Sequence, residues 1–391
     1  MRWASALSSK ERTGEAIAEA AAIIRRGLAG ERADLVIAFA SPHHLDAAPR
    51  IPALVEEELP GSLLVGCTGS GIIGAGHEVE GASALSLTAA SLPGVTLTPF
   101  HLDQRELPES ADAQEWRETV EVDAEPPPHF LLLADPMTIE AAALVAGLDA
   151  AYPRSSKFGG LASGGPVPGA NRLFVRARTW RSGAVGVALA GNLTVETIVA
   201  QGCRAIGKPM IATRCQRNVL LEVDGRPPLE VLRDLFPTLP ARDQELLSHS
   251  LFIGIEMRNA VEYREGELLV RNLVGMDAET GAVAVGAPLQ PMQVVQFLLR
   301  DARTAEEDLT RLLERSAARA QRPAGALLFS CLGRGQHLFG RPDHDTDLFR
   351  DKVGAVPLGG FFCNGEIGQV GGSTFLHGYT SSFALFSEAR S

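Results

Sequence analysis

The stretch PLGGFFCNGEIGQVGGSTFLHGYTSSFALF, Pro357 to Phe386, concentrates glycine and small polar residues between two apolar runs that are typical of strands. The glycines are too frequent for a helix or for a plain strand, and they stand at Gly359, Gly360, Gly365, Gly368, Gly371 and Gly372. So many glycines indicate turns with positive φ, or backbone that another group must approach closely. Two interpretations follow: a tight hairpin that satisfies its own backbone, or one wall of a pocket.

Related patterns occur twice more, which favours the pocket. Buried strands are predicted at 33–42, 129–138 and 325–335, because each is a short, continuous apolar run that ends in polar residues. A helix is predicted after each strand, at 45–59, 139–151 and 343–352. Glycine turns then follow at 66–69, 160–164 and 360–365. We therefore expect a mixed α/β fold of repeated strand–helix–strand units with glycine-rich turns and sheets covered by helices.

The length of 391 residues predicts two or three domains. An amphipathic helix is expected near the start, with apolar residues at helical spacing between residues 10 and 29. We place an N-terminal helical segment at 1–30 and the two domains at 31–205 and 206–391.

Composition excludes several classes of partner and compartment. The formal net charge of -11 argues against nucleic acid and against an anionic membrane surface. No apolar run reaches the roughly 18 residues of a membrane span, and the N-terminus lacks the order of a signal peptide. We expect a cytoplasmic protein. The five cysteines are widely spaced without a CxxC pair, so neither a disulfide framework nor a zinc site is predicted.

Ligands of α/β proteins bind beyond the carboxyl ends of parallel strands. If the units share one sheet system, the predicted ligand-binding residues are Cys331, Arg334, Cys363, Asn364 and Glu366, with Thr68, Asp135 and Ser163. Arg334 would offer a bidentate fork to a carboxylate, and Glu366 or Asp135 would face an ammonium group. Such a pocket would hold the two ends of an amino acid. The alternative is that Arg334 and Glu366 pair and brace the loops.

Cys331 also permits a chemical function. A cation three residues away lowers the pKa of a thiol in general, and His377 is available as a base. A cysteine-dependent hydrolase or transferase, or a thiol sensor, is therefore an alternative. Most cysteines at strand ends are packed and inert, so the leading expectation is no enzyme activity. A protein-interaction scaffold without any small ligand is a third class.

Three segments resemble one known family. Leu63–Ile73 is similar to the early glycine turn of FIST-N domains, and Ala326–Gly335 and Gly360–Gly368 are similar to the two signatures of FIST-C. The closing His377-Gly378-Tyr379-Thr380 also fits. The resemblance covers nearly the whole chain, and its C-terminal part is the more specific.

The resemblance implies a sensory, small-ligand-binding module of signal transduction, with amino acids among the suggested ligands. The family also occurs in an F-box protein of animals. Some members are proposed as haem-based nitric oxide sensors, but the histidines of this chain do not single out an axial ligand. The cofactor is therefore unknown, with haem as one option. We see no F-box, kinase or cyclase segment, so we expect the signal to pass to a separate signalling protein.

Overall fold

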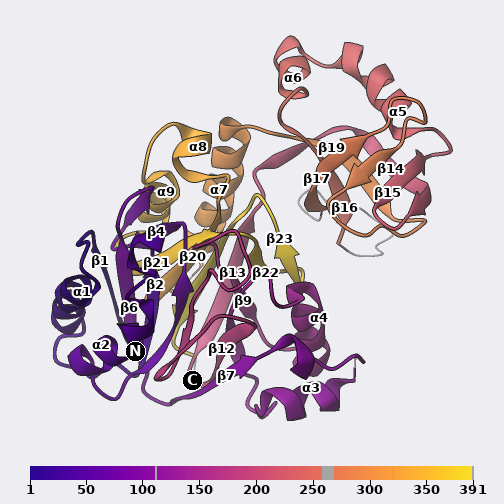
Figure 1. Cartoon of the computed structure of the whole chain (residues 1–391). Helices are drawn as coiled ribbons and strands as arrows, with labels where there is room; N and C mark the ends of the chain where they lie inside the picture. Colours follow the sequence, from indigo (N-terminus) through magenta and orange to yellow (C-terminus); the bar gives the residue numbers. More distant parts are fainter. Residues whose placement is uncertain (111, 258–267, 320, 390–391) are drawn as a thin grey trace. The chain divides into compact units, whose positions relative to one another are not determined.

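The computed structural model describes residues 1–110, 112–257, 268–319 and 321–389, and in these ranges the chain forms two compact units. The larger unit is Met1–Ala200 with Thr310–Ser391, and the smaller is Gln201–Leu309 (Figure 1). Within the described ranges, the larger unit holds three six-stranded sheets and the smaller unit a closed barrel. The expected mixed α/β class, with sheets covered by helices, is confirmed.

The larger unit consists of three repeats of one element order: strand, helix, strand, helix, strand, hairpin, strand. Repeat 1 comprises β1 (Arg2–Ser8), α1 (Thr13–Gly27), β2 (Leu35–Ala40), α2 (Ile51–Glu58), β3 (Leu63–Thr68), β4 (Gly71–Gly74), β5 (His77–Glu80) and β6 (Leu85–Ser91). Repeat 2 comprises β7 (Val95–Leu102), α3 (Ala113–Val120), β8 (His129–Ala134), α4 (Ala141–Ala151), β9 (Lys157–Leu161), β10 (Leu173–Val175), β11 (Arg178–Trp180) and β12 (Ala184–Gly191).

Repeat 3 is interrupted in sequence by the smaller unit. It comprises β13 (Thr194–Ala200), the end of α7 (Ala302–Ala317), β20 (Gly325–Cys331), α8 (Gly335–Phe339), α9 (His344–Val353), β21 (Leu358–Cys363), β22 (Glu366–Val370), β23 (Ser373–His377) and β24 (Ser381–Ser387). The three expected strand–helix–strand units are thus present, but the glycine turns predicted at 66–69, 160–164 and 360–365 begin inside strands β3, β9 and β21. Strand β1, which opens repeat 1, was not predicted.

Each sheet is built around one parallel pair, and the three sheets have the same strand order. The orders are β1-β6-β2-β3-β10-β11, β7-β12-β8-β9-β22-β23 and β13-β24-β20-β21-β4-β5. The parallel pairs are β2 with β3, β8 with β9, and β20 with β21. Such strands are buried on both faces, which explains why β2 and β8 are almost continuously apolar.

The hairpins are exchanged between repeats in a closed cycle. Hairpin β4–β5 of repeat 1 pairs with β21 of repeat 3, hairpin β22–β23 of repeat 3 pairs with β9 of repeat 2, and hairpin β10–β11 of repeat 2 pairs with β3 of repeat 1. Every sheet therefore takes its last two strands from another repeat.

Equivalent glycines mark the second parallel strand of each repeat. Gly66, Gly159 and Gly360 stand opposite Ala38, Leu132 and Leu328. A Cβ at Gly159 or Gly360 would lie 1.8 Å from the carbonyl oxygen of Leu132 or Leu328, and the two glycines have φ of +148° and +158°. Both explanations that the sequence left open apply here. The φ of these residues favours glycine, and the neighbouring strand comes too close for a side chain.

One core joins the inner faces of all three sheets. It includes Phe39, Leu131, Phe158, Phe329 and Phe361, all fully or almost fully buried. Helices cover the outer faces: α1 and α2 lie along the sheet of repeat 1, and α3 and α4 lie beside the sheet of repeat 2 (Figure 1). The predicted helix at 10–29 is confirmed as α1. On the third sheet, Phe349 of α9 stacks on Phe383 of β24 with ring centroids 5.2 Å apart.

The smaller unit has a separate hydrophobic core inside its barrel. The barrel order is β14-β15-β18-β17-β16-β19. Its elements are β14 (Cys203–Gln216), β15 (Val219–Val223), α5 (Pro228–Leu235), α6 (Ala241–Leu246), β16 (Leu251–Glu256), β17 (Leu268–Met276), β18 (Val283–Val285) and β19 (Val294–Arg300). Among the helices of the described ranges, none combines the length and the hydropathy that a membrane-spanning helix needs.

Candidate functional site

The carboxyl ends of the parallel pairs meet and hydrogen-bond with one another. The N–H of Ser163 donates to the carbonyl of Thr68 at 3.2 Å, and the N–H of Ser70 donates to Ser163 Oγ at 2.9 Å. Ser163 Oγ in turn donates to the carbonyl of Phe362. The N–H of Asn364 donates to the carbonyl of Leu161 at 3.0 Å. The three repeats are therefore joined at the strand ends where the sequence predicts a ligand site.

The predicted site residues differ widely in their access to solvent. Asn364 is exposed and Cys331 is partly buried, whereas the other six are buried, namely Thr68, Asp135, Ser163, Arg334, Cys363 and Glu366. The Asp135 carboxylate accepts hydrogen bonds from Asn171 Nδ2 at 2.8 Å and from Thr138 Oγ1 at 2.7 Å. Glu366 Oε2 accepts from the N–H and Oγ1 of Thr380, at 3.1 and 2.8 Å.

Arg334 is held by a residue that the sequence did not single out. Its Nε and Nη2 donate to the two oxygens of Asp345, at 2.8 and 2.9 Å, and both side chains are buried. Asp345 also accepts from Ser381 Oγ at 2.9 Å and lies 2.9 Å from His344 Nδ1. The bidentate fork predicted for a ligand carboxylate is therefore occupied by Asp345.

Electrostatics keep this ion pair charged. Burial alone would raise the pKa of the Asp345 carboxyl, but Arg334 and His344 outweigh burial and hold that pKa well below its usual range. For Arg334, burial opposes the charge, yet Asp345 raises the guanidinium pKa above its ordinary value. The pair is thus a fixed dipole at the end of β20.

A buried carboxyl from repeat 1 reaches the same region. Glu78 of β5 accepts from the N–H of Thr346 at 2.8 Å, and its own N–H donates to Asp343 at 2.6 Å. Burial, followed by the nearby Asp345 and Asp343, raises the pKa of Glu78 to about 8. No sequence signal indicated Glu78, because its neighbours come from residues more than 250 positions later.

His377, the predicted alternative base, stands opposite Glu366 in the β22–β23 pair. Its Nε2 donates to the carbonyl of Gly368 at 3.1 Å, and the ring is buried. This bond fixes the ring against its own hairpin. Cys363 is fully buried, and burial followed by the proximity of Glu366, Cys67 and Cys331 raises the pKa of its thiol well above the ordinary value.

A cluster on repeat 2 has the donor types of a metal site. The ligand atoms of His101, Asp103 and Glu106 lie within 4.8 Å of one another. These groups already have protein partners: Asp103 and Glu106 form a capping box, and His101 Nε2 donates to the carbonyl of Ser182 at 3.0 Å. The cluster is therefore explained by local structure.

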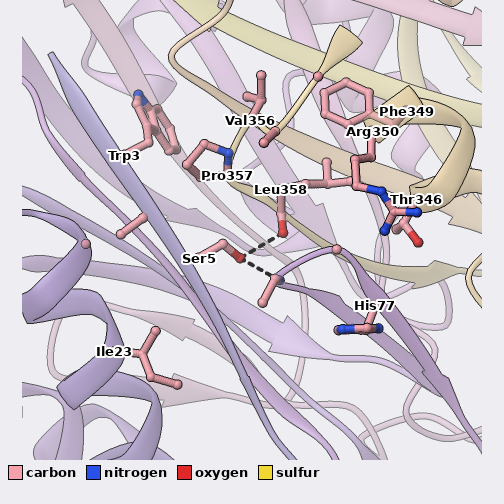
Figure 2. A pocket seen from close by; sticks show the side chains of 16 residues that line it. Trp3, Ser5, Ile23, His77, Thr346, Phe349, Arg350, Val356, Pro357 and Leu358 are labelled. Atoms are coloured by element: carbon pink, nitrogen blue, oxygen red, sulfur yellow. Dashed lines mark hydrogen bonds between the residues drawn. The ribbon is translucent and has the colours of Figure 1, made fainter. Parts of the chain in front are cut away.

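A pocket of about 480 Å³ opens between repeat 1 and repeat 3. Its walls come from β1, α1, the β4–β5 turn, α9 and the segment that leads into β21. Figure 2 shows Arg350, Thr346 and His77 on one side of the pocket and Trp3 and Ile23 on the other. Ser5 Oγ donates to the carbonyl of Leu358 at 2.7 Å and accepts from the N–H of Ala75 at 3.1 Å. The sequence did not indicate this pocket, because its residues come from five separate segments.

Arg350 and His77 lie on the polar side of this pocket. Arg350 Nη2 donates to Asp347 at 2.6 Å, and His77 Nδ1 lies 3.1 Å from Asp343. The side chains of Arg350 and His77 remain more than half exposed, at 54% and 63%. The pocket thus combines an apolar wall with accessible positive charge.

Comparisons with known proteins identify the family of this chain. The FIST N domain matches residues 34–226, and the FIST C domain matches residues 228–369. An uncharacterized protein of Mycobacterium tuberculosis is 38% identical over 388 residues, covering 99% of this chain and 100% of that protein. Another, of Mycobacterium bovis, is 37% identical over 374 residues, covering 95% of each chain.

More distant likenesses are shorter or weaker. F-box only protein 22 of Homo sapiens is 30% identical over 135 residues, covering 29% of this chain and 33% of that protein. The solved structure of a cyanuric acid hydrolase from A. caulinodans covers 100% of both chains with a TM-score of 0.33 and 9% identity, values too low to support any argument. On the two domain matches and the full-length mycobacterial relatives, the chain belongs to the FIST family of sensory domains, with a FIST N domain followed by a FIST C domain.

Proposed function

We propose that this protein is a sensor that binds a small carboxylate, an amino acid or a similar metabolite, in the pocket between repeat 1 and repeat 3. The observation that carries the proposal is the pocket itself (Figure 2). Its volume of about 480 Å³ lies in the range of roughly 300–1,000 Å³ that small-molecule sites occupy. Membership of a sensory family supports a binding function over catalysis.

The walls of the pocket fit an amphipathic ligand. Ile23, Val356 and Pro357 supply partly exposed apolar surface, and burying such surface drives association. Arg350 supplies a planar guanidinium, which binds carboxylates through charge-assisted hydrogen bonds. The carboxylate would therefore lie towards Arg350 and His77, with the rest of the ligand against Ile23 and Pro357.

The pocket also spans a junction that a ligand would stabilise. Its lining residues come from β1 and α1 of repeat 1 and from α9 of repeat 3. A ligand that contacts both repeats favours the arrangement in which they are close, which is how binding is converted into a change of state. Transfer of this signal to a separate signalling protein is part of the same proposal.

The sequence predicts a different ligand site, in the loops around Cys331, Arg334 and Glu366. Polar groups in those loops already bond to other parts of the protein, as in the Arg334–Asp345 pair and the Thr380–Glu366 bonds. A ligand there would have to compete with these bonds. For this reason we prefer the pocket in Figure 2.

The test uses a panel of probes on matched variants. The twenty proteinogenic amino acids and the same carbon skeletons without the amino group are screened by thermal shift, and the best probe is titrated by calorimetry. Arg350→Gln is compared with Arg341→Gln, because both arginines donate to Asp347 and both are about half exposed, but only Arg350 lines the pocket.

We expect one probe to bind the wild type and Arg341→Gln alike. Loss of a charged hydrogen bond worth about 1.5–3 kcal/mol should weaken binding to Arg350→Gln at least about tenfold. Equal affinity of the two variants would refute this pocket. If Glu366→Gln instead abolishes binding and Arg350→Gln does not, the ligand lies at the predicted loops. The absence of any bound probe would favour a protein-interaction scaffold.

A further inference from the structure

Two cysteines are the last residues of neighbouring parallel strands, and they lie directly opposite each other. Cys331 is the last residue of β20 and Cys363 the last residue of β21, and they are direct partners in the register. Neighbouring strands in a sheet lie about 4.8 Å apart. This spacing falls within the roughly 4.4–6.8 Å between Cα atoms that disulfides bridge. The backbone therefore places the two residues at bonding distance.

The two side chains share one face of the sheet. Phe329 and Phe361 precede the cysteines by two residues, are likewise partners, and have ring centroids 6.0 Å apart in the inner core. Because side chains alternate along a strand, residues two apart point to the same side. Cys331 and Cys363 therefore both project from the inner face, at the carboxyl ends of their strands.

The surroundings of the two thiols assign them different roles. Cys331 is partly buried and so is accessible to a small oxidant, whereas Cys363 is fully buried. Cys331 also lies close enough to Arg334 to contribute to the raised pKa of that guanidinium. The Cys363 thiol, which burial and Glu366 disfavour as a thiolate, is suited to the second step rather than the first.

We propose that Cys331 and Cys363 are a redox pair that forms a reversible intramolecular disulfide when a peroxide oxidises the protein. All five cysteines are thiols in the structure, which corresponds to the reduced form. The inference is independent of the ligand pocket, because neither cysteine lines it.

The chemistry proceeds in two balanced steps. The Cys331 thiolate attacks one oxygen of hydrogen peroxide, an S–O bond forms, the O–O bond breaks, and hydroxide leaves and takes up a proton as water. The Cys363 sulfur then attacks the Cys331 sulfenic acid. An S–S bond forms, the S–O bond breaks, and the departing hydroxide takes the Cys363 proton as a second water. Both sulfurs are oxidised, and the peroxide is reduced.

Cys67 is the competing partner. It lies near enough to Cys363 to contribute to the raised pKa of that thiol, but it is fully buried on β3 of another sheet. The strand register favours Cys331 because it needs no movement of one sheet against another.

The experiment treats the reduced full-length protein with stoichiometric hydrogen peroxide, denatures it, blocks the remaining thiols with N-ethylmaleimide, and maps the peptides by mass spectrometry. We expect the intact mass to fall by two hydrogens before alkylation, two fewer alkylated cysteines, and one linked peptide pair that joins Cys331 to Cys363. Dithiothreitol should restore five alkylated cysteines.

Variants separate the two roles. Cys331→Ser should lose the reaction, whereas Cys363→Ala should stop at a Cys331 sulfenic acid that dimedone traps. Cys203→Ser in the smaller unit is the control and should form the same bond as the wild type. A link from Cys331 to Cys67, a dimer joined through Cys331, or full alkylation of Cys331 and Cys363 after oxidation would each overturn the proposal. The wild-type peptide map decides the question even if Cys363→Ala does not fold.

Discussion

Arg334 and Asp345 form a bidentate ion pair in which both side chains are buried, with 2.8 Å from Nε to Oδ2 and 2.9 Å from Nη2 to Oδ1. The pair joins the end of β20 to the start of α9, and Ser381 of β24 adds a hydrogen bond to the same carboxylate. It therefore links three elements of repeat 3. Removing either partner would be costly, because the other charge would stay buried without compensation.

Removing the cation should destabilise the fold strongly. We expect Arg334→Met to lower the free energy of unfolding by roughly 3–5 kcal/mol, because Asp345 would be left charged and buried. Urea unfolding followed by circular dichroism measures the change. The control is Arg341→Met, which breaks a partly exposed pair with Asp347 and should cost less than about 1 kcal/mol. Equal losses in the two variants would contradict this account.

Glu78 should make stability depend on pH. Its pKa is raised from 4.5 to about 8, first by burial and then by Asp345 and Asp343, so the folded state keeps a proton that the unfolded state releases. The stabilisation is fully present below pH 4.5 and is lost as the pH rises towards 8. The loss has a slope of up to roughly 1.4 kcal/mol for each pH unit.

The variant Glu78→Gln isolates this contribution. Its unfolding free energy should stay close to that of the wild type near pH 4.5 and should exceed it increasingly towards pH 8, because glutamine never takes the charge. Denaturant unfolding at several pH values tests this. The readout is the difference in unfolding free energy between the two proteins. Parallel curves for wild type and variant would show that Glu78 ionises in the folded state as it does in the unfolded one.

Two helical glycines should respond in opposite directions to alanine. A Cβ at Gly147 of α4 would lie 1.9 Å from the Trp116 ring, whereas a Cβ at Gly14 of α1 would come no closer than 4.0 Å to Leu54. Alanine is favoured over glycine in helices by about 1 kcal/mol. Overpacking against a fixed ring costs about 1–3 kcal/mol. We expect a lower Tm for Gly147→Ala and an equal or higher Tm for Gly14→Ala, measured by calorimetry.

The glycines of the parallel pairs should tolerate no side chain. Gly159→Ala and Gly360→Ala each place a Cβ 1.8 Å from a carbonyl oxygen of the neighbouring strand, at a φ that L-residues rarely adopt. Loss of several kcal/mol, or loss of folded protein, is expected. Gly378→Ala is the control, because no heavy atom lies within 4 Å of its added Cβ. The measurements are the yield and the Tm of the three variants. A stable Gly360→Ala would refute the close approach between the two strands.

The local part of the architecture was readable from the sequence. Continuous apolar strands such as β2 and β8 are typical of parallel pairs, and Gly66, Gly159 and Gly360 mark where the second strand presses on the first. The exchange of hairpins was not predictable, because pairing of Ile73 with Gly360 depends on residues far apart in sequence and leaves no periodic signal.

The site was harder to predict for the same reason. Thr68, Ser163 and Asn364 lie at converging strand ends as expected, and hydrogen bonds join these ends. Ser163 bonds to both other repeats, which no single segment reveals. The partner of Arg334 proved to be Asp345, at the start of a helix whose orientation depends on packing. The sequence spacing of charged residues does not show which carboxylate pairs with a buried arginine.

The cyclic exchange of hairpins has a consequence for synthesis on the ribosome. Strand β21 begins about 280 residues after β5 ends, yet it supplies the sheet edge on which hairpin β4–β5 pairs. At translation rates of about 5–20 residues per second, the nascent hairpin waits roughly 15–60 s for its partner strand. During that interval the emerging chain carries an uncompleted edge, which is the kind of surface that chaperones cover. Production of this protein should therefore depend on chaperone supply more than its final stability would suggest.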